Sequence, residues 1–310
     1  MIDFLILPLQ IQIYSMFRYA FLAIALSFLL FACNPTGSQS GENDFISGSN
    51  NRSAFTQDGE IVYALKIPTD IVNFFEETGT GFDPGITCPL EKIPLYDNPE
   101  HIALLLGVLG VDLSYCTLFE RVTETAEYYH HIELLAGKLE LPREIFEASP
   151  GVQRAYLENP DSLKNQIFEI YTEMDMQFRE NNQLSLASLS LLGGWLETMY
   201  IGVVIYKNKT ILEMGDRILQ QKYSLNSLSG ILANQQESLM VRRYMHTVNK
   251  LKEVYDEVDI RYETEGFEMD DNEQVFHASV AEIIYEPESL NEICRIILQL
   301  REDILPMVNR

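Results

Sequence analysis

Two carboxylates stand inside apolar runs, where acid–base chemistry could be built. Asp112 interrupts the apolar stretch His101–Phe119, and Glu197 is the one charged residue of the stretch Leu184–Tyr206. A buried carboxylate without a partner is costly, so it becomes neutral, pairs with a cation or accepts hydrogen bonds. If the two faced each other, they could share a proton or hold a cation, with Tyr115 beside them. The alternative is structural: a hydrogen bond to a tyrosine, or a salt bridge to Arg or Lys at a helix end.

A second group of polar residues has the spacing of metal ligands. Glu124, Glu127, His130 and His131 place carboxylates and imidazoles three or four residues apart. On one helix this spacing can supply ligands, as in carboxylate-bridged di-iron bundles. Such a bundle needs a second Glu-x-x-His, which this sequence lacks, so a solvent-exposed helix face is the alternative. We therefore assign no metal site and expect no cofactor.

Familiar catalytic motifs are absent from the sequence. There is no nucleophile elbow, no Gly-rich phosphate loop and no His-Glu-x-x-His, so we assign no catalytic residue. Several aromatic residues could line a ligand pocket, although aromatic residues at helical spacing are also typical of a core. These are Tyr115, Tyr128, Tyr129, Trp195 and Tyr200.

The apolar stretch Leu184–Tyr206 predicts a helix around which the rest of the chain is organised. A helix of that length spans about 35 Å, and one that is apolar on nearly every face must be surrounded by other helices or by lipid. Small residues favour neighbouring helices, because they let two backbones approach closely. They are Ser185, Ser188, Ser190, Gly193, Gly194 and Gly202. The length also allows a membrane crossing, but Glu197 near the middle and the lack of an adjacent basic cluster argue against it.

The remaining segments predict an all-α fold, a multi-helix bundle or array around that central apolar helix. His101–Phe119 is expected to be its direct neighbour. Val122–Leu139 is amphipathic and is expected to turn Ala126, Tyr129, Leu134 and Leu135 inward. Further helices are expected at residues 143–148, 162–180, 208–222, 225–234, 237–258 and 287–305.

Two segments break the helical pattern. Residues 80–99 hold four prolines, which predicts a structured loop rather than a helix. Residues 259–285 place apolar residues on both sides of an acidic, Gly-containing stretch, which predicts a short extended or β-hairpin-like arm.

The charge balance limits the class of partner. The chain has 46 acidic and 22 basic side chains and a formal net charge of −24. Such a field repels nucleic acid and anionic membrane surfaces, and it tolerates basic partners or divalent cations. We expect no nucleic-acid partner.

The N-terminal region predicts export. From Met16, which we take as the possible true start, one basic residue and an apolar run lead to Leu30-Phe31-Ala32-Cys33, the layout of a signal peptide over residues 1–32. These last four residues resemble the lipobox of bacterial lipoproteins, which implies lipidation of Cys33 and membrane attachment through several acyl chains. The polar residues up to about position 60 predict a flexible tether, followed by a single helical domain over residues 61–310. Asn34, where inner-membrane lipoproteins usually carry Asp, suggests the outer membrane.

Two stretches carry a family resemblance. Leu106–Tyr115 (LGVLGVDLSY) and Gly193–Tyr200 (GGWLETMY) are similar to a group of helical lipoproteins from Bacteroidetes with no assigned activity. The resemblance implies an exported, lipid-anchored, mostly helical domain and carries over no functional residue. We therefore expect a non-enzymatic binding or scaffolding protein of the cell envelope, which recognises an envelope protein or a small ligand. The alternative is an envelope hydrolase or metal-dependent enzyme that uses the buried carboxylates.

Overall fold

A computed structural model of the chain describes residues 81–147, 160–209, 211–270 and 273–305. The expected signal peptide, Cys33, the tether and the segment up to residue 80 lie outside the described residues. The predictions made for them stay predictions.

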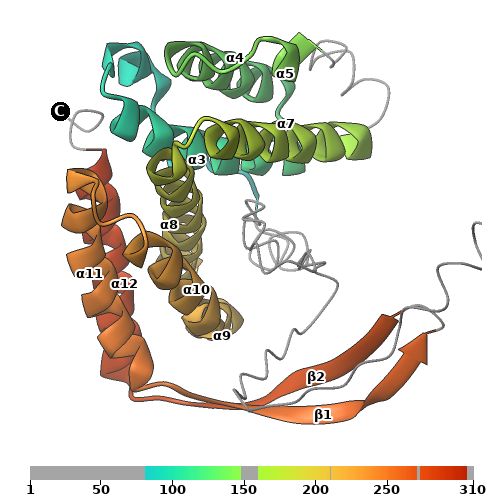
Figure 1. Cartoon of the computed structure of the whole chain (residues 1–310). Coiled ribbons are helices and arrows are strands. Elements are labelled where there is room, and N and C mark those ends of the chain that lie inside the picture. The colour runs from blue at the N-terminus through green and yellow to red at the C-terminus, as the bar shows by residue number, and fades with distance from the viewer. Residues whose placement is uncertain (1–80, 148–159, 210, 271–272, 306–310) are drawn as a thin grey trace, which may run out of the picture. The chain divides into compact units, whose positions relative to one another are not determined.

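The described chain is predominantly helical (Figure 1), as the sequence predicts. In chain order its elements are η2 (Leu90–Leu95), α3 (Pro99–Leu118), α4 (Val122–Lys138), α5 (Glu144–Glu147), α7 (Pro160–Glu180), α8 (Leu184–Lys209), α9 (Leu212–Gln220), α10 (Lys222–Ala233), α11 (Leu239–Asp256), β1 (Asp259–Asp270), β2 (Glu273–Ile284) and α12 (Pro287–Ile304). The loop expected over residues 80–99 contains the short 3-10 helix η2.

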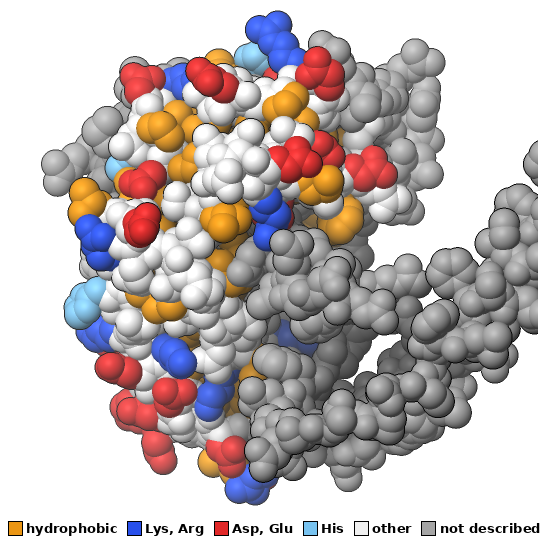
Figure 2. All heavy atoms as spheres, viewed as in Figure 1, with side chains coloured by type: hydrophobic (Ala, Val, Ile, Leu, Met, Phe, Trp, Pro, Cys, Tyr) orange, Lys and Arg blue, Asp and Glu red, His pale blue; other side chains and the backbone are white. Residues whose placement is uncertain are grey.

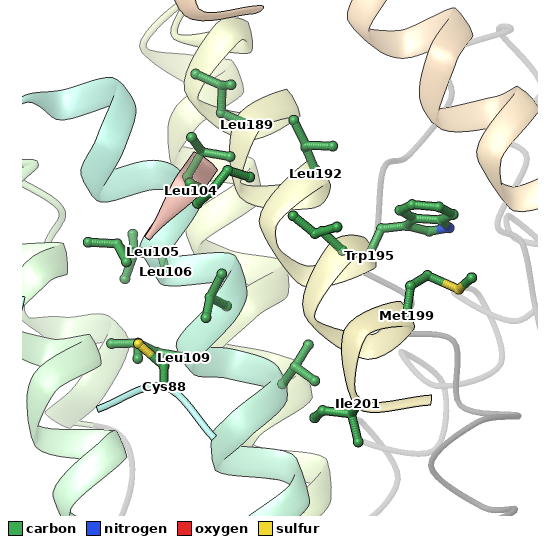
Figure 3. Packing of buried hydrophobic residues seen from close by; sticks show 14 of the residues in the cluster. Cys88, Leu104, Leu105, Leu106, Leu109, Leu189, Leu192, Trp195, Met199 and Ile201 are labelled. Atoms are coloured by element: carbon green, nitrogen blue, oxygen red, sulfur yellow. The ribbon is translucent and has the colours of Figure 1, made fainter. Parts of the chain in front are cut away.

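Helix α8 is the central helix that the sequence predicts. It contacts α3, α7, α9, α10 and α12, and its most extensive contact is with α3. Figure 3 shows leucines of α3 and α8 packed into one core, with Leu104, Leu189 and Leu192 among them. Both helices are long and apolar enough to cross a membrane, yet 83% of the most apolar window of each is buried among other parts of the protein. Within the described structure, neighbouring helices therefore supply the apolar surroundings that such helices need.

Glycines explain the close contact between α3 and α8. A Cβ atom added to Gly107 would overlap the carbonyl oxygen of Ser190, and one added to Gly193 would overlap that of Leu104. The two backbones thus meet directly, with no side chain between them. This confirms the expectation that small residues of the central helix permit close packing.

The ends of two helices illustrate how local sequence sets the fold. The Asn98 side chain accepts a hydrogen bond from the backbone N–H of His101 at 3.1 Å, and Pro99 fits the first turn of α3, where its missing N–H is not needed. The second helix end is the C-terminal end of α8, which lies at Lys209. A separate helix, α9, begins at Leu212. The single helix predicted over residues 208–222 is therefore wrong at its start.

The inward face of α4 differs from the prediction. Of the residues expected to face inward only Leu135 is buried, while Ala126, Tyr129 and Leu134 are half-buried. The buried face consists of Thr125, Tyr128, Ile132, Leu135 and Ala136. Tyr128 is buried more deeply than Tyr129, and its hydroxyl donates to the carbonyl oxygen of Cys88, at 2.7 Å, in the loop that packs against α4.

The arm predicted near residues 259–285 is a two-stranded antiparallel ribbon. Its backbone register pairs Ile260 with Ile283 and Phe267 with Phe276, and the register shifts at two places along β1.

On the face of the molecule shown in Figure 2, acidic, basic and hydrophobic side chains are interspersed.

Candidate functional site

Glu197 lies on α8 and forms a buried ion pair with Arg301 of α12. Its Oε1 lies 2.9 Å from Nη2 and its Oε2 lies 3.1 Å from Nε, a two-point contact between carboxylate and guanidinium. The two side chains are 0% and 6% exposed. Burial opposes the charged form of Arg301, but the charge and hydrogen bonds of Glu197 outweigh burial and raise the pKa of the guanidinium. The Tyr200 ring stacks on this cation, with its centroid 4.1 Å from Cζ.

Asp112 lies on α3 and is also fully buried, but its partners differ. Its Oδ2 accepts a hydrogen bond from the backbone N–H of Cys88 at 2.9 Å, while its Oδ1 has no hydrogen-bond partner among the described residues. Burial first, and then the negative charge of Glu197, raise the pKa of Asp112 well above its ordinary value. The carboxyl group therefore favours its neutral form in the folded protein.

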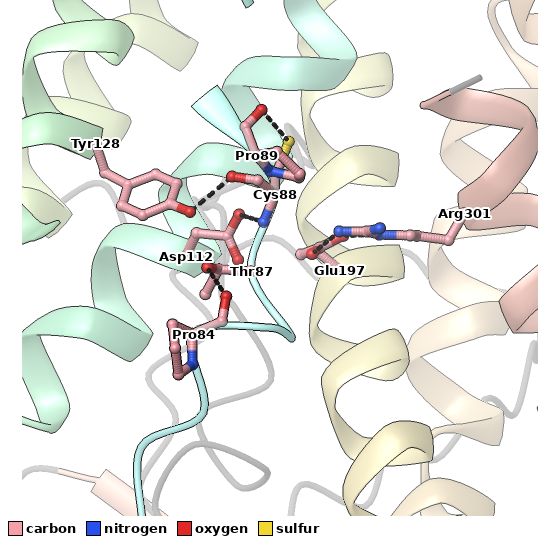
Figure 4. Close-up of polar contacts among 8 residues, drawn as sticks. All are labelled: Pro84, Thr87, Cys88, Pro89, Asp112, Tyr128, Glu197 and Arg301. Atoms are coloured by element: carbon pink, nitrogen blue, oxygen red, sulfur yellow. Dashed lines mark hydrogen bonds and ion pairs between the residues drawn. The ribbon is translucent and has the colours of Figure 1, made fainter. Parts of the chain in front are cut away.

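The two carboxylates approach the same buried region from opposite sides of a loop. Figure 4 shows Thr87 and Cys88 running between Asp112 and Glu197. Asp112 binds the N–H of Cys88 and Tyr128 binds its C=O, so both backbone groups of this residue are held. The structure thus brings the predicted pair near enough to influence each other electrostatically, but each carboxylate has its own structural partner.

Tyr115 supports the start of this loop. Its hydroxyl accepts a hydrogen bond from the backbone N–H of Asp83 at 3.1 Å, and its ring packs against Phe82 and Phe119. Burial is the main reason that the pKa of Tyr115 is raised, which disfavours its use as a base.

The four residues with metal-ligand spacing face mainly outward on α4. Glu124 is bound by the guanidinium of Arg121 at 2.7 Å, and the hydrogen bonds from Arg121 lower its pKa. His131 places Nδ1 2.8 Å from the carbonyl oxygen of Glu127, and His130 is exposed. Within residues 81–305, as far as they are described, no three His, Cys, Asp or Glu side chains gather as a metal site would require.

The aromatic candidates separate into core and pocket residues. Tyr115, Tyr128 and Trp195 are buried, and the indole N–H of Trp195 donates to Ser224 at 2.9 Å. Tyr129 is half-buried against the core. Tyr200 alone among the five lines a cavity of about 260 Å³, which is formed by the loop, α8 and α12. The lining residues are Gly85, Thr87, Pro89, Tyr200, Val204, Leu298, Arg301 and Glu302.

Sequence reasoning missed Arg301, although the sequence contained a signal for it. On α12, Arg301 follows Ile297 by four residues and precedes Ile304 by three, so it occupies the apolar face. A basic residue at such a position must find a buried anion. The opposite residue, Glu197, could be named from the sequence, but their pairing could not.

Comparison with protein-family models, with curated proteins and with solved structures finds no match for this chain. Asp112 and Glu197 are both 0% exposed. As they stand, neither can reach a substrate, and their geometry fits a structural role in joining the loop, α3, α8 and α12.

Proposed function

We propose that this chain is a lipid-anchored protein of the cell envelope, placed in the outer membrane by its Asn34, whose helical domain acts as a non-enzymatic binding or scaffolding module. The proposal rests on the lipobox-like Leu30–Cys33 for attachment and on the family resemblance for the class of protein. Its expected partners are the membrane, through the lipid, and an envelope protein or a small ligand.

One observation supports the non-enzymatic role above the others. The two carboxylates best suited to catalysis are sealed in the interior, where Glu197 is neutralised by Arg301 and Asp112 holds the Cys88 backbone. A catalytic pair needs a cleft in which it can meet water and substrate. Here both groups stabilise the packing of the elements around the loop.

The rival function, an envelope hydrolase, is tested by activity measurements on matched variants. We expect no turnover of ester, phosphoester, peptide or glycoside model substrates by the wild-type protein. The variants Asp112→Asn and Glu197→Gln should then be indistinguishable from it. Turnover by the wild type that disappears in Asp112→Asn, with an unchanged circular dichroism spectrum, would overturn the non-enzymatic proposal.

The anchor is tested by a single substitution at the lipobox. Cys33→Ser removes the sulfur that would carry the lipid, so we expect loss of labelled fatty acid and either release from membranes or retention of the unprocessed form. Asn34→Ser is the matched control, because it leaves Cys33 in place and should still be labelled. Unchanged labelling and membrane association of Cys33→Ser would show that the proposed localisation is wrong.

A further inference from the structure

The cavity beside Arg301 has a buried polar floor and an exposed rim. Gly85, Pro89 and Glu302 are exposed at its edge, and Arg301 at its base is only 5% exposed. Its remaining walls are half-buried. A concave site in which a buried charged group lies among apolar walls has the features of sites that bind small ligands.

Arg301 has hydrogen-bonding capacity left at this floor. A guanidinium has five N–H donors, and Glu197 takes one from Nε and one from Nη2. Nη1 makes no hydrogen bond with a described residue. Because Arg301 lines the cavity, Nη1 is the donor that a ligand oxygen could use there.

The surrounding charges favour a neutral ligand. The charge of Arg301 is already balanced by Glu197 at 2.9 Å, and Glu302 adds another carboxylate to the cavity wall. An anionic ligand would bring its charge close to both carboxylates, which is unfavourable in partly buried surroundings. A neutral carbonyl oxygen can use Nη1 without that repulsion.

The chemistry of the cavity walls and the cavity volume restrict the class of ligand further. Pro89, Val204 and Leu298 are apolar, while Arg301 offers a donor and Glu302 an acceptor. A peptide group offers a C=O that can accept from the Arg301 donor and an N–H that can donate to Glu302. An aliphatic side chain next to it can contact the apolar walls. The cavity of about 260 Å³ lies just below the range of roughly 300–1,000 Å³ that is usual for drug-sized ligands. It suits one or two residues rather than a folded partner.

We propose that this cavity binds a short neutral peptide segment with a small aliphatic side chain, whose carbonyl oxygen accepts a hydrogen bond from Nη1 of Arg301. The segment's N–H faces Glu302, and its side chain contacts Pro89, Val204 and Leu298. The inference rests on the binding role proposed above and names the ligand class for it.

The test uses the full chain purified in detergent and a peptide mimic, N-acetylalanine methylamide. Saturation-transfer NMR should detect saturable binding at about millimolar concentrations, as a ligand of about ten non-hydrogen atoms allows. N-acetylalanine, which carries a carboxylate, should bind at least fivefold more weakly. N-acetylglucosamine, which has an amide but a polar body, should also bind more weakly. Tighter binding of either, or no saturable binding of the mimic, would overturn the proposal.

Variants locate the binding within the cavity. Leu298→Trp fills the cavity and should abolish binding. Arg301→Lys should weaken binding at least tenfold, because an ammonium lacks the planar fork of donors with which a guanidinium meets both Glu197 oxygens and a ligand oxygen. Arg295→Lys, on the exposed face of the same helix, is the control and should bind as the wild type does. If Arg301→Lys fails to fold, Leu298→Trp decides the matter, since unchanged binding in that variant would place the ligand elsewhere.

These outcomes are independent of the anchoring test. A Cys33→Ser protein that stays on membranes would end the proposed localisation but leave peptide binding in the cavity possible. Absence of peptide binding would remove the cavity's role and leave the lipid anchor untouched.

Discussion

The surroundings of Glu197 and of Asp112 differ although both side chains are completely buried. Glu197 meets a guanidinium that satisfies both of its oxygens, and the Tyr200 ring covers one face of that cation. Asp112 receives one backbone N–H and leaves one oxygen without a described partner. The two side chains are thus equally buried, but only Glu197 has a cation for its charge and hydrogen-bond donors for both oxygens.

The difference follows from the elements that reach each carboxylate. Helix α12 brings Arg301 to Glu197 (Figure 4), and an arginine can match both the charge and the shape of a carboxylate. The loop brings only the peptide group of Cys88 to Asp112. An uncompensated charge in the interior is expensive, so burial raises the pKa of Asp112 and favours its neutral form. The comparison teaches that the partner, and not the depth of burial, decides how a buried acid is compensated.

The largest effect is expected from removing one partner of the ion pair. Arg301→Met leaves Glu197 buried without a cation, and should lower the free energy of unfolding by about 3–5 kcal/mol in urea denaturation. The double variant Glu197→Met with Arg301→Met removes both charges and should recover most of the loss.

An exposed pair on the same helix serves as the control for this comparison. Arg295 and Glu292 lie 2.6 Å apart, and their side chains are 54% and 36% exposed. Arg295→Met should cost less than about 1 kcal/mol. A loss of that small size for Arg301→Met would contradict the claim that the buried pair is held by mutual compensation.

A smaller effect is expected from separating the helices that carry the two carboxylates. Gly193→Ala places a methyl group against the backbone of Leu104, and should lower the free energy of unfolding by about 1–3 kcal/mol as an overpacked contact. Gly137→Ala on α4 is the control, because no atom lies within 4 Å of the added methyl. It should raise stability by up to about 1 kcal/mol. Equal effects of the two substitutions would show that the close contact between α3 and α8 is not required.

The smallest effect is expected at Asp112 and depends on pH. Because folding raises the pKa of Asp112, the unfolded chain loses this proton at a lower pH than the folded protein does. The wild type therefore loses stability as the pH rises above about 4, the ordinary pKa of an aspartate, toward the folded pKa. Asp112→Asn keeps an oxygen for Cys88 and removes this titration. It should be more stable than the wild type at pH 7.5, by about 1 kcal/mol, with little gain at pH 4.

Urea denaturation at pH 4 and pH 7.5 measures the stability gain of Asp112→Asn at each pH. The control is Glu133→Gln, at an exposed position of α4. A gain for Asp112→Asn that is the same at both pH values would mean that Asp112 is not neutral in the folded protein. Such a result would remove the distinction drawn between the two carboxylates.

Much of the helical architecture could be predicted because it depends on local patterns. The apolar run of α8 and its small residues are visible along the chain. The inward face of α4 was predicted only in part: Leu135 is buried, but Tyr128, equivalent to Tyr129 in hydrophobicity, is the more deeply buried and donates to the Cys88 carbonyl. This contact joins residues forty positions apart in the sequence, so the local pattern does not show it.

The candidate site was predictable only in part, for the same reason. A carboxylate within an apolar run shows that a partner is needed, so Asp112 and Glu197 could be singled out. The identity of the partner depends on distance in space. Arg301 lies 104 residues from Glu197 in the sequence, and the cavity is formed by three segments that are not consecutive.

The sequence by itself determined that the described chain is helical, that one apolar helix lies at its centre, and that two carboxylates would require compensation. These are properties of hydrophobic period, residue size and the cost of burying charge, all of which act over a few residues or on one side chain. Only the tertiary structure decided that α12 would supply a cation to Glu197 and a loop a single N–H to Asp112. Hydrogen bonds and ion pairs have short range, so their partners are chosen by how the helices and loops pack together.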